Sequence, residues 1–400
     1  MEPKPKVITK KAGMHKRYAT GFQYQKDSVY FAQVQEHLIQ PGAKELSDLG
    51  AEETRSCFRG IYFKADKKTF YKITYMTRLA SRILAPLVTF PCDSSDILYK
   101  TGKKIKWEDI IPFKKTFAVK ANVSDSSITH SQFASLRLKD AIVDYFRERT
   151  GKRPNVEKLL PDTLINLHIR KDQADISLDA SGAAPLHKRG YREATVEGPM
   201  QETIAAALIG FTGWDGSTPL YDPMCGSGTL LCEALMRYSN IPAGIFREKF
   251  GLEMMPDFNR ELWQQVKDTC NSSIKELPEH IISGSDISED AVNAAKTNLM
   301  GLHFGRRIHV SQKDFRSIPA INNSIIVINP PYGIRMGKNQ NLNLLYKELG
   351  DFLKQNCKGA TAYIYFGDPG YISKMGIKAA WKKPLKAGGL DGRLVRYDMY

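Results

Sequence analysis

The sequence predicts an α/β protein in which a Rossmann-like parallel sheet follows a smaller α+β half. In residues 199–400, short apolar runs alternate with segments of helical periodicity, which is the pattern of a parallel sheet with crossover helices. Two of these runs lead into unusual loops, a glycine-rich turn at residues 222–229 and an Asn-Pro-Pro-Tyr turn at residues 329–332. Open α/β sheets bind ligands beyond the carboxyl ends of their strands. The two turns therefore predict a binding site at that edge of the sheet.

The amino-terminal residues predict a basic tail. Residues 1–17 carry six Lys and Arg against one Glu, and no apolar segment follows them, which excludes a secretory signal. We expect residues 1–27 to be disordered and solvated, with an accessory nucleic-acid arm as the functional alternative.

Residues 28–94 predict a small α+β domain. We expect a helical segment over residues 28–53 with a break at Pro41–Gly42, and then a strand over residues 58–63. Apolar residues at helical spacing over residues 66–86 predict a helix, or a strand joined to a helix.

Residues 95–182 predict a second small α/β unit. Its longest element is an amphipathic helix that also carries Arg137 and Lys139. The expected elements are a strand at 117–121, the helix at 130–149, and a hairpin of two strands at 164–169 and 174–179.

The carboxyl-terminal half supplies the strands and helices of the parallel sheet. Strands are expected at 219–221, 281–286, 308–311, 325–328 and 360–366, with a final pair at 385–389 and 394–400. Helices are expected at 199–210, 229–238 and 289–299, with an irregular, partly helical insertion at 241–279.

The two turns carry the chemistry of the predicted site. Gly226 and Gly228 give a path without side chains, so the backbone can approach a nucleotide-like ligand closely. The helix that begins near Thr229 offers unpaired N–H groups to a carboxylate or a phosphate. In the second turn, Asn329 offers an amide and Tyr332 an aromatic ring, joined by two rigid prolines. Each turn alone is a weak signal, but the pair after two strands is far more specific.

Two acids complete the candidate set. Asp286 ends the second predicted strand, where a carboxylate can accept hydrogen bonds from both hydroxyls of a ribose. It lies 58 residues after Gly228, whereas the plain dinucleotide pattern places the acid about 20 residues on. An insertion between helix and strand is therefore required. Asp314 follows the third strand and either faces the ligand or caps the next turn.

Composition and charge exclude several classes of protein. Apolar residues make up 42% and charged residues 25%, and no apolar run is long enough to span a bilayer. Six cysteines without Cys-x-x-Cys or Cys/His spacing argue against zinc and disulfides and favour a reducing cytoplasm. Residues 1–190 hold 34 Lys and Arg against 21 Asp and Glu, but residues 191–400 hold 24 against 22. The positive first half favours a polyanion partner.

Residues 183–198 form a basic connector between the two halves. Its cationic and polar side chains predict phosphate contacts beside the site, although an ordinary polar linker has the same composition. The candidate RNA contacts of the connector are His187, Lys188, Arg189 and Arg192.

Together, the two turns resemble those of the class I S-adenosylmethionine-dependent methyltransferases that modify exocyclic amines of nucleobases. The resemblance implies a seven-stranded methyltransferase sheet with a terminal edge hairpin, no metal, and S-adenosylmethionine as the cofactor. The implied catalytic residues are Asn329, Pro330, Pro331 and Tyr332. The implied cofactor-binding residues are Asp222, Pro223, Met224, Cys225, Gly226, Gly228, Thr229, Asp286, Ile287 and Asp314.

The first half resembles a THUMP domain, on the Arg137-x-Lys139-Asp140-Ala141-Ile142 helix and the hairpin that follows it. The connector is similar to the Leu-His-x-Arg-Gly-Tyr-Arg junction of THUMP-containing guanine-N2 methyltransferases of large-subunit rRNA, in the form without a fused second enzyme. The resemblance of the connector and of the THUMP-like half implies guanine N2 in RNA, most of all in 23S rRNA, as the target. It also implies that Arg137 and Lys139 are further RNA contacts. The implied domains are a tail (1–27), a ferredoxin-like domain (28–94), a THUMP domain (95–182), the connector (183–198) and a methyltransferase domain (199–400).

Several alternatives remain open at this point. The same enzyme class includes tRNA guanine-N2 and DNA adenine-N6 methyltransferases, because the Asn-Pro-Pro-Tyr turn serves both amines. A non-catalytic RNA-binding factor in ribosome assembly is a second possibility. A dinucleotide oxidoreductase fits the glycine turn but gives the second turn no role. The sequence also leaves the oligomeric state open, with a monomer as the working expectation.

Overall fold

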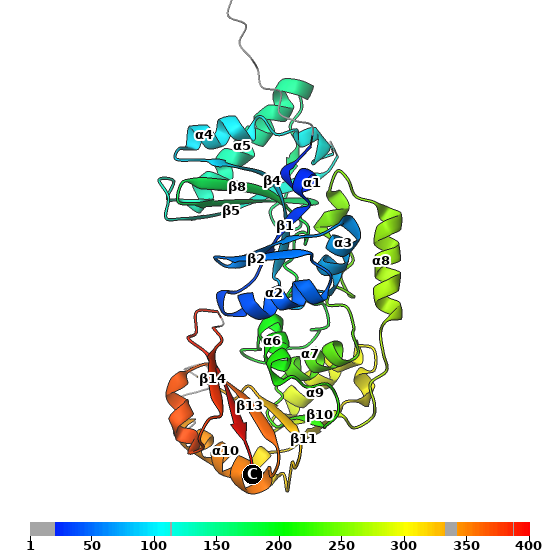
Figure 1. The fold of residues 1–400 in the computed structure, drawn as a ribbon, viewed down its shortest axis with the longest axis vertical. Coiled ribbons are helices and arrows are strands. Elements are labelled where there is room, and N and C mark those ends of the chain that lie inside the picture. The colour runs from blue at the N-terminus through cyan, green and yellow to red at the C-terminus, as the bar shows by residue number, and fades with distance from the viewer. Residues whose placement is uncertain (1–20, 113, 333–341, 387) are drawn as a thin grey trace, which may run out of the picture.

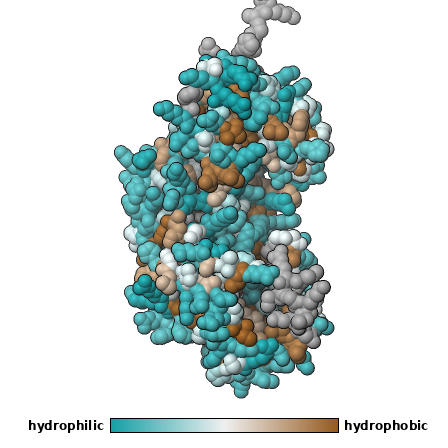
Figure 2. All heavy atoms as spheres, turned by 180° about the vertical axis from the view of Figure 1, so that it is seen from behind, coloured by the Kyte–Doolittle hydropathy of each residue, from teal (hydrophilic) through white to brown (hydrophobic). Residues whose placement is uncertain are grey.

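A computed structural model describes residues 21–112, 114–332, 342–386 and 388–400 of the chain. Residues 1–20 of the predicted tail lie outside the described residues. The prediction of disorder is wrong for the end of the tail, because Gln23–Asp27 form helix α1, in which Tyr24 is buried. Figure 1 shows two parts, each built on its own sheet, with the amino-terminal part above and the carboxyl-terminal part below. The face turned away in Figure 1 is mostly hydrophilic, with separate hydrophobic patches (Figure 2). No helix within the described ranges is long and apolar enough to cross a membrane.

One eight-stranded sheet runs through the whole amino-terminal part, in the order β2-β3-β1-β4-β8-β7-β5-β6. Strand β4 pairs with β1 on one side and with β8 on the other, so the two predicted small domains share a continuous sheet. The first unit consists of α1 (Gln23–Asp27), β1 (Val29–Gln33), α2 (Ile39–Asp48), β2 (Glu53–Cys57), β3 (Gly60–Lys64), α3 (Lys67–Met76) and β4 (Arg82–Pro91). The second consists of α4 (Ser95–Gly102), β5 (Thr116–Ser124), α5 (Ser131–Thr150), β6 (Asn155–Val156), β7 (Thr163–Arg170) and β8 (Gln173–Asp179).

The prediction of a helical segment over residues 28–53 is wrong for its first part. Residues Val29–Gln33 form a strand in which Tyr30 and Ala32 are buried and their neighbours are half-buried, so the apolar period is two. Helix α2 begins only at Ile39. Pro41 lies in its first turn, where no backbone N–H is needed, and therefore does not break the helix.

The hairpin of β7 and β8 agrees with its prediction. Lys171 and Asp172 connect the strands, and both have positive φ angles, 50° and 54°. Two consecutive left-handed residues are what a two-residue hairpin requires, because their twist matches that of the flanking strands.

The carboxyl-terminal part is a seven-stranded sheet in the order β11-β10-β9-β12-β13-β15-β14. Strand β15 is antiparallel to both of its neighbours, β13 and β14, and the other six strands run in one direction. Its strands are β9 (Leu220–Asp222), β10 (Ile282–Asp286), β11 (His309–Gln312), β12 (Ile325–Ile328), β13 (Thr361–Phe366), β14 (Trp381–Pro384) and β15 (Arg393–Asp398). Its helices are α6 (Glu202–Thr212), α7 (Thr229–Tyr238), α8 (Arg260–Ser272), α9 (Glu289–Met300) and α10 (Leu342–Asn356). The expected edge strand at 385–389 is wrong, because β14 ends at Pro384.

The register of the sheet brings the predicted site together. Leu220 at the start of β9 pairs with Ile282 of β10 and with Ile325 of β12. Strand β9 therefore lies between β10 and β12, and all three run in the same direction. The turns that follow them must leave the sheet at one edge.

The insertion between β9 and β10 packs against the amino-terminal part. Helix α8 lies beside α3 (Figure 1), and the rings of Tyr75 and Trp263 meet edge to face with centroids 5.6 Å apart. The hydroxyl of Tyr24 also donates a hydrogen bond to Asp257, at 2.7 Å. The segment that separates the glycine turn from Asp286 thus joins the two parts of the molecule.

Candidate active site

A cavity of about 780 Å³ lies at the carboxyl ends of β9, β10 and β12. Both predicted turns line it, so the glycine turn and the Asn-Pro-Pro-Tyr turn face a common space. The predicted residues in its wall are Asp222, Pro223, Met224, Cys225, Gly226, Thr229, Asp286, Ile287, Asp314, Asn329, Pro330, Pro331 and Tyr332.

The glycine turn has the backbone conformation that its sequence predicts. Gly226 and Gly228 have φ angles of 52° and 79°, in the left-handed region that side chains rarely adopt. A Cβ atom on Gly228 would also lie 3.0 Å from the Cβ of Ala295 on α9. Helix α7 begins directly after this turn, at Thr229. The N–H groups of its first turn therefore lie beside the cavity.

Asp286 connects the ends of two neighbouring strands. One carboxylate oxygen accepts a hydrogen bond from the N–H of Gly226 at 2.9 Å, and the other accepts one from the N–H of Ser288 at 3.0 Å. The 58-residue gap is filled by α7 and the insertion with α8, after which β10 returns to the side of β9. The half-buried carboxylate keeps further lone pairs for a ligand in the cavity.

Asp222 and Cys225 form the buried wall of the turn. Asp222 is 1% exposed, and its carboxylate accepts a hydrogen bond from the N–H of Met224 at 3.0 Å. Burial, opposed by this hydrogen bond and assisted by the nearby Asp286, raises the pKa of the Asp222 carboxyl well above its usual range. Burial also raises the pKa of the Cys225 thiol, which keeps the sulfur protonated and unsuited to act as a nucleophile.

Asn329 presents an unused acceptor. Its Oδ1 atom is buried and has no hydrogen-bond partner among the described residues. A buried carbonyl oxygen without a partner is unfavourable, so this atom is suited to accept a hydrogen bond from a ligand. Pro330 and Pro331 follow it and have no N–H of their own that could compete.

Asp314 caps the next turn, which is one of its two predicted roles, and it also lines the cavity. Its carboxylate accepts a hydrogen bond from the N–H of Arg316 at 2.9 Å, which caps the turn after β11, and it forms an ion pair with the Arg316 guanidinium at 2.8 Å. Arg316 also pairs with Glu348 of α10 at 2.6 Å. All three residues line the cavity.

Sequence reasoning missed part of the cavity wall. Of the segment 199–210, which is predicted as a helix, Pro199 and Met200 line the cavity, and both precede α6. The wall also includes Val196–Gly198 and the α10 residues Leu344, Leu345 and Glu348. No motif marks these residues, and the Gly198-Pro199 pair is the one available signal of a special backbone there.

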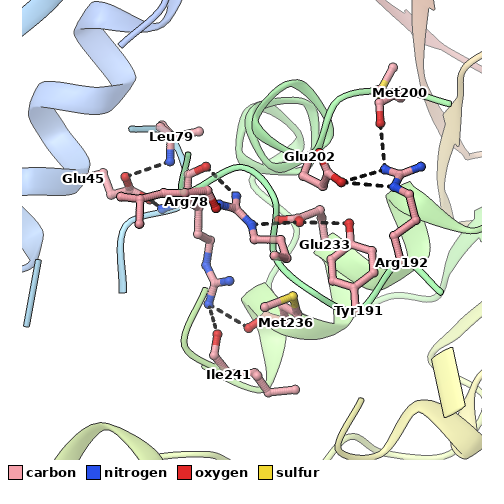
Figure 3. Close-up of polar contacts among 12 residues, drawn as sticks. Glu45, Arg78, Leu79, Tyr191, Arg192, Met200, Glu202, Glu233, Met236 and Ile241 are labelled. Atoms are coloured by element: carbon pink, nitrogen blue, oxygen red, sulfur yellow. Dashed lines mark hydrogen bonds and ion pairs between the residues drawn. The ribbon is translucent and has the colours of Figure 1, made fainter. Parts of the chain in front are cut away.

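The prediction that Arg189 contacts RNA is wrong. Its side chain is fully buried and forms an ion pair with Glu233 of α7, which is also fully buried, at 3.3 Å. Its guanidinium donates hydrogen bonds to the carbonyl oxygens of Leu186 and Arg78. Figure 3 shows the surrounding network, in which Arg78 of the amino-terminal part reaches the carbonyl oxygens of Met236 and Ile241. Arg189 therefore joins the two parts of the protein.

Arg192 also has a structural environment. It forms an ion pair with Glu202 at 3.0 Å and donates to the carbonyl oxygen of Met200 (Figure 3). This contradicts its prediction as an RNA contact, because the guanidinium is engaged and its side chain is only 19% exposed. Because Met200 lines the cavity, the hydrogen bond from Arg192 helps to hold this part of the cavity wall in place.

The remaining predicted RNA contacts differ in accessibility. Lys188 is exposed, whereas His187 is half-buried, and burial beside Arg189 and Lys188 lowers the pKa of His187 to about 4. Arg137 stacks on the Tyr99 ring at 4.3 Å and pairs with Asp96 at 2.9 Å. Lys139 pairs with Asp140 at 2.8 Å. All four side chains are more accessible than that of Arg189. The ion pairs of Arg137 with Asp96 and of Lys139 with Asp140 must open before either cation can contact a phosphate.

The cavity fits S-adenosylmethionine. The left-handed glycines let the backbone approach the cofactor, and Asp286 stands where a ribose diol can be bound. Among the described residues no group of three or more His, Cys, Asp and Glu side chains could hold a metal ion.

Family models match all three folded units of the chain. Residues 189–396 match the RMKL-like methyltransferase domain, residues 92–179 match the THUMP domain, and residues 38–84 match the RlmL ferredoxin-like domain. The predicted fold class is therefore confirmed.

Known proteins are similar over nearly the whole chain. A Synechocystis protein named as an RNA methyltransferase is 36% identical over 93% of this chain and 97% of its own length. A Syntrophotalea carbinolica protein named ribosomal RNA large subunit methyltransferase K/L is 37% identical over 89% of this chain, but this covers only 52% of that protein. The chain spans about half the length of the K/L relatives.

Solved structures are similar over the same extent. A methyltransferase crystallised with S-adenosylhomocysteine matches with a TM-score of 0.81 and 26% identity, over 93% of this chain and 98% of the other. A Listeria monocytogenes protein described as a predicted N6-adenine-specific DNA methylase matches with a TM-score of 0.82 and 27% identity, over 93% and 96%. With its ferredoxin-like, THUMP and methyltransferase domains, the chain belongs to the RMKL-like family of S-adenosylmethionine-dependent RNA methyltransferases.

Proposed function

We propose that this protein transfers a methyl group from S-adenosylmethionine to the exocyclic N2 amine of a guanine in RNA, and that the RNA is 23S rRNA. The observation that carries the chemistry is the buried Oδ1 of Asn329, which has no hydrogen-bond partner in the described part of the chain and lies in the cavity that the glycine turn also lines. The rRNA substrate rests on the relatives named for it, which share the domains of this chain but are about twice as long.

The chain supplies binding and orientation. When bound, S-adenosylmethionine supplies a methyl group that is already activated on a sulfonium. Asn329 Oδ1 and the carbonyl of Pro330 accept the two N–H bonds of the target amine, which draws its lone pair out of conjugation with the base. The neighbouring prolines keep these acceptors in fixed directions. Holding the amine in line in this way contributes to the rate because the reaction becomes effectively unimolecular.

Tyr332 binds the base that carries the amine. A target base must leave its stack to enter the cavity, and stacking on an aromatic ring contributes about 1–3 kcal/mol per base in single-strand binders. After the transfer the amine proton leaves to water. Asp222 is buried and its carboxylate accepts a hydrogen bond from its own turn, so it does not act as the general base.

The amino-terminal part delivers the RNA. Residues 1–190 hold most of the net positive charge, and phosphate contacts dominate nucleic-acid affinity. Lys188 is the exposed candidate contact, and His187, Arg137 and Lys139 are half-buried candidates. A ribosomal substrate places the protein in the cytoplasm, and its six unpaired cysteines are compatible with that compartment.

Methylation of purified RNA tests the proposal. The protein is incubated with radiolabelled S-adenosylmethionine and equal amounts of unmodified 23S rRNA, tRNA or DNA, and the labelled nucleosides are separated after digestion. We expect label in N2-methylguanosine from 23S rRNA, and none with Asn329→Ala. Label in tRNA alone or in N6-methyladenine from DNA would overturn the substrate assignment.

A further inference from the structure

The Asn-Pro-Pro-Tyr turn is held from outside by helix α10. Pro330 and Pro331 fix their own φ angles but cannot donate backbone hydrogen bonds, so the ψ angles of the turn must be held by other contacts. The hydroxyl of Tyr346, fifteen positions further along the chain, donates a hydrogen bond to the carbonyl oxygen of Pro331 at 3.1 Å. This contact joins α10 to the end of the turn.

Tyr346 is itself fixed in one orientation. Its side chain is fully buried, and its ring stacks on Tyr371 with centroids 4.7 Å apart and planes within 7°, and on Phe366 at 5.5 Å. Burial raises the pKa of the Tyr346 hydroxyl, so it stays protonated and remains a donor. Because stacking on both neighbours fixes the ring, the Tyr346 hydroxyl can restrain the peptide whose carbonyl oxygen accepts its hydrogen bond.

The carbonyl that Tyr346 holds belongs to the peptide that joins Pro331 to Tyr332. Its direction sets the ψ angle of Pro331 and hence the direction in which the Tyr332 side chain leaves the backbone. The Tyr332 ring lies directly against Gly367, where a Cβ atom would come within 2.4 Å of the ring, and meets the edge of Tyr365 at 6.0 Å. The ring can therefore occupy this position only because residue 367 has no side chain.

We propose that Tyr346 is a positioning residue for methyl transfer: its hydroxyl, through the Pro331 carbonyl, keeps the Tyr332 ring on Gly367 and the acceptors of the turn in place. The inference rests on the proposed function for its kinetic consequence. Its structural content, that Tyr346 restrains the turn, stands without it.

Tyr346→Phe removes only the hydroxyl and keeps the stacked ring. We expect kcat to fall about 5- to 10-fold, the effect of one neutral hydrogen bond, with the Kd for S-adenosylhomocysteine unchanged within about twofold. The matched control is Tyr397→Phe, because the Tyr397 hydroxyl is buried in the same apolar cluster without a partner among the described residues. Equal kcat values for the two variants would overturn the proposal.

A double-mutant cycle separates positioning from general stability. Because Tyr346 is proposed to act in part through the Tyr332 ring, the effect of Tyr346→Phe should be clearly smaller in a Tyr332→Ala background. Losses that multiply independently in the double variant would show that Tyr346 does not act through that ring, and would overturn the proposal.

Hydrogen exchange provides a readout that does not need activity. We expect the amide of Tyr332 to exchange several-fold faster in Tyr346→Phe than in the parent or in Tyr397→Phe. Equal exchange in all three proteins would refute the restraint. A parent protein that methylates no RNA would instead refute the proposed function, and this measurement would still decide the role of Tyr346.

Discussion

The two turns that line the cavity and the basic connector are all short motifs, but the fold uses them in opposite ways. The turns leave the sheet at the carboxyl ends of β9 and β12 and present polar groups to a cavity, including the Oδ1 of Asn329, which no described residue binds. The connector instead turns Arg189 inward, to Glu233 on α7. A motif therefore identifies a relationship among proteins, whereas burial decides whether a given side chain contacts a ligand or holds the fold together.

The strongest test of this comparison is Arg189→Ala. Removal of one partner of a buried ion pair leaves the other charge unpaired, so we expect a loss of about 3–5 kcal/mol of stability. Urea unfolding followed by fluorescence measures it. The double variant Arg189→Met with Glu233→Leu removes both charges and should recover much of the loss. If Arg189→Ala unfolded like the parent and lost RNA affinity instead, the connector would be an RNA clamp after all.

Asn329→Ala tests the other side of the comparison. We expect kcat to fall about 10²–10³-fold, the usual effect of losing one preorganised polar group that acts on the reacting atoms. Binding of S-adenosylhomocysteine, measured by calorimetry, should stay within about twofold of the parent. Asn293→Ala, on the exposed face of α9, is the control with the same chemical change. Parent-like turnover in Asn329→Ala would contradict the assignment of the turn.

The sequence predicted the catalytic half well because its signals are local. Strands β12 and β13 are short apolar runs, and Gly226, Asp286 and Asn329 lie at or just after the ends of β9, β10 and β12. Parallel strands place all such ends at one edge, so the fold class was enough to bring these residues together. The 58-residue gap before Asp286 did not matter, since strand order rather than sequence distance sets its position.

The errors come from contacts that no local pattern contains. A five-residue strand such as Val29–Gln33 is too short for its period of two to stand out beside the helix that follows. The pairing of β4 with β8, which makes one sheet of two predicted domains, joins residues such as Leu84 and Asp179 across the whole THUMP region. The burial of Arg189 depends on α7, in the other half of the molecule.

The pH dependence of stability tests whether His187 of the connector is buried. Its pKa lies near 4 in the folded protein, below the usual value of 6.5, so the unfolded chain binds the proton more tightly. The contribution to stability is fully present above pH 6.5 and is lost as the pH falls toward 4. We expect His187→Gln to reduce the fall of Tm by a few degrees over this range. An identical Tm profile in parent and variant would mean that the imidazole is solvated.

Lys188→Ala is expected to have the smallest effect, and it tests whether any part of the connector contacts RNA. Lys188 is exposed and has no ion-pair partner in the described part of the chain, so its charge is available to a phosphate. We expect RNA affinity to fall a few-fold at low salt, with the slope of log K against log salt reduced by about 0.7–0.9. Lys296→Ala on the exposed face of α9 serves as the matched control. The difference in RNA affinity between parent and variant must become smaller as salt increases if Lys188 contacts a phosphate. A difference that is equal at all salt concentrations would point to altered packing around the neighbouring Arg189 instead. The connector would then have a purely structural role.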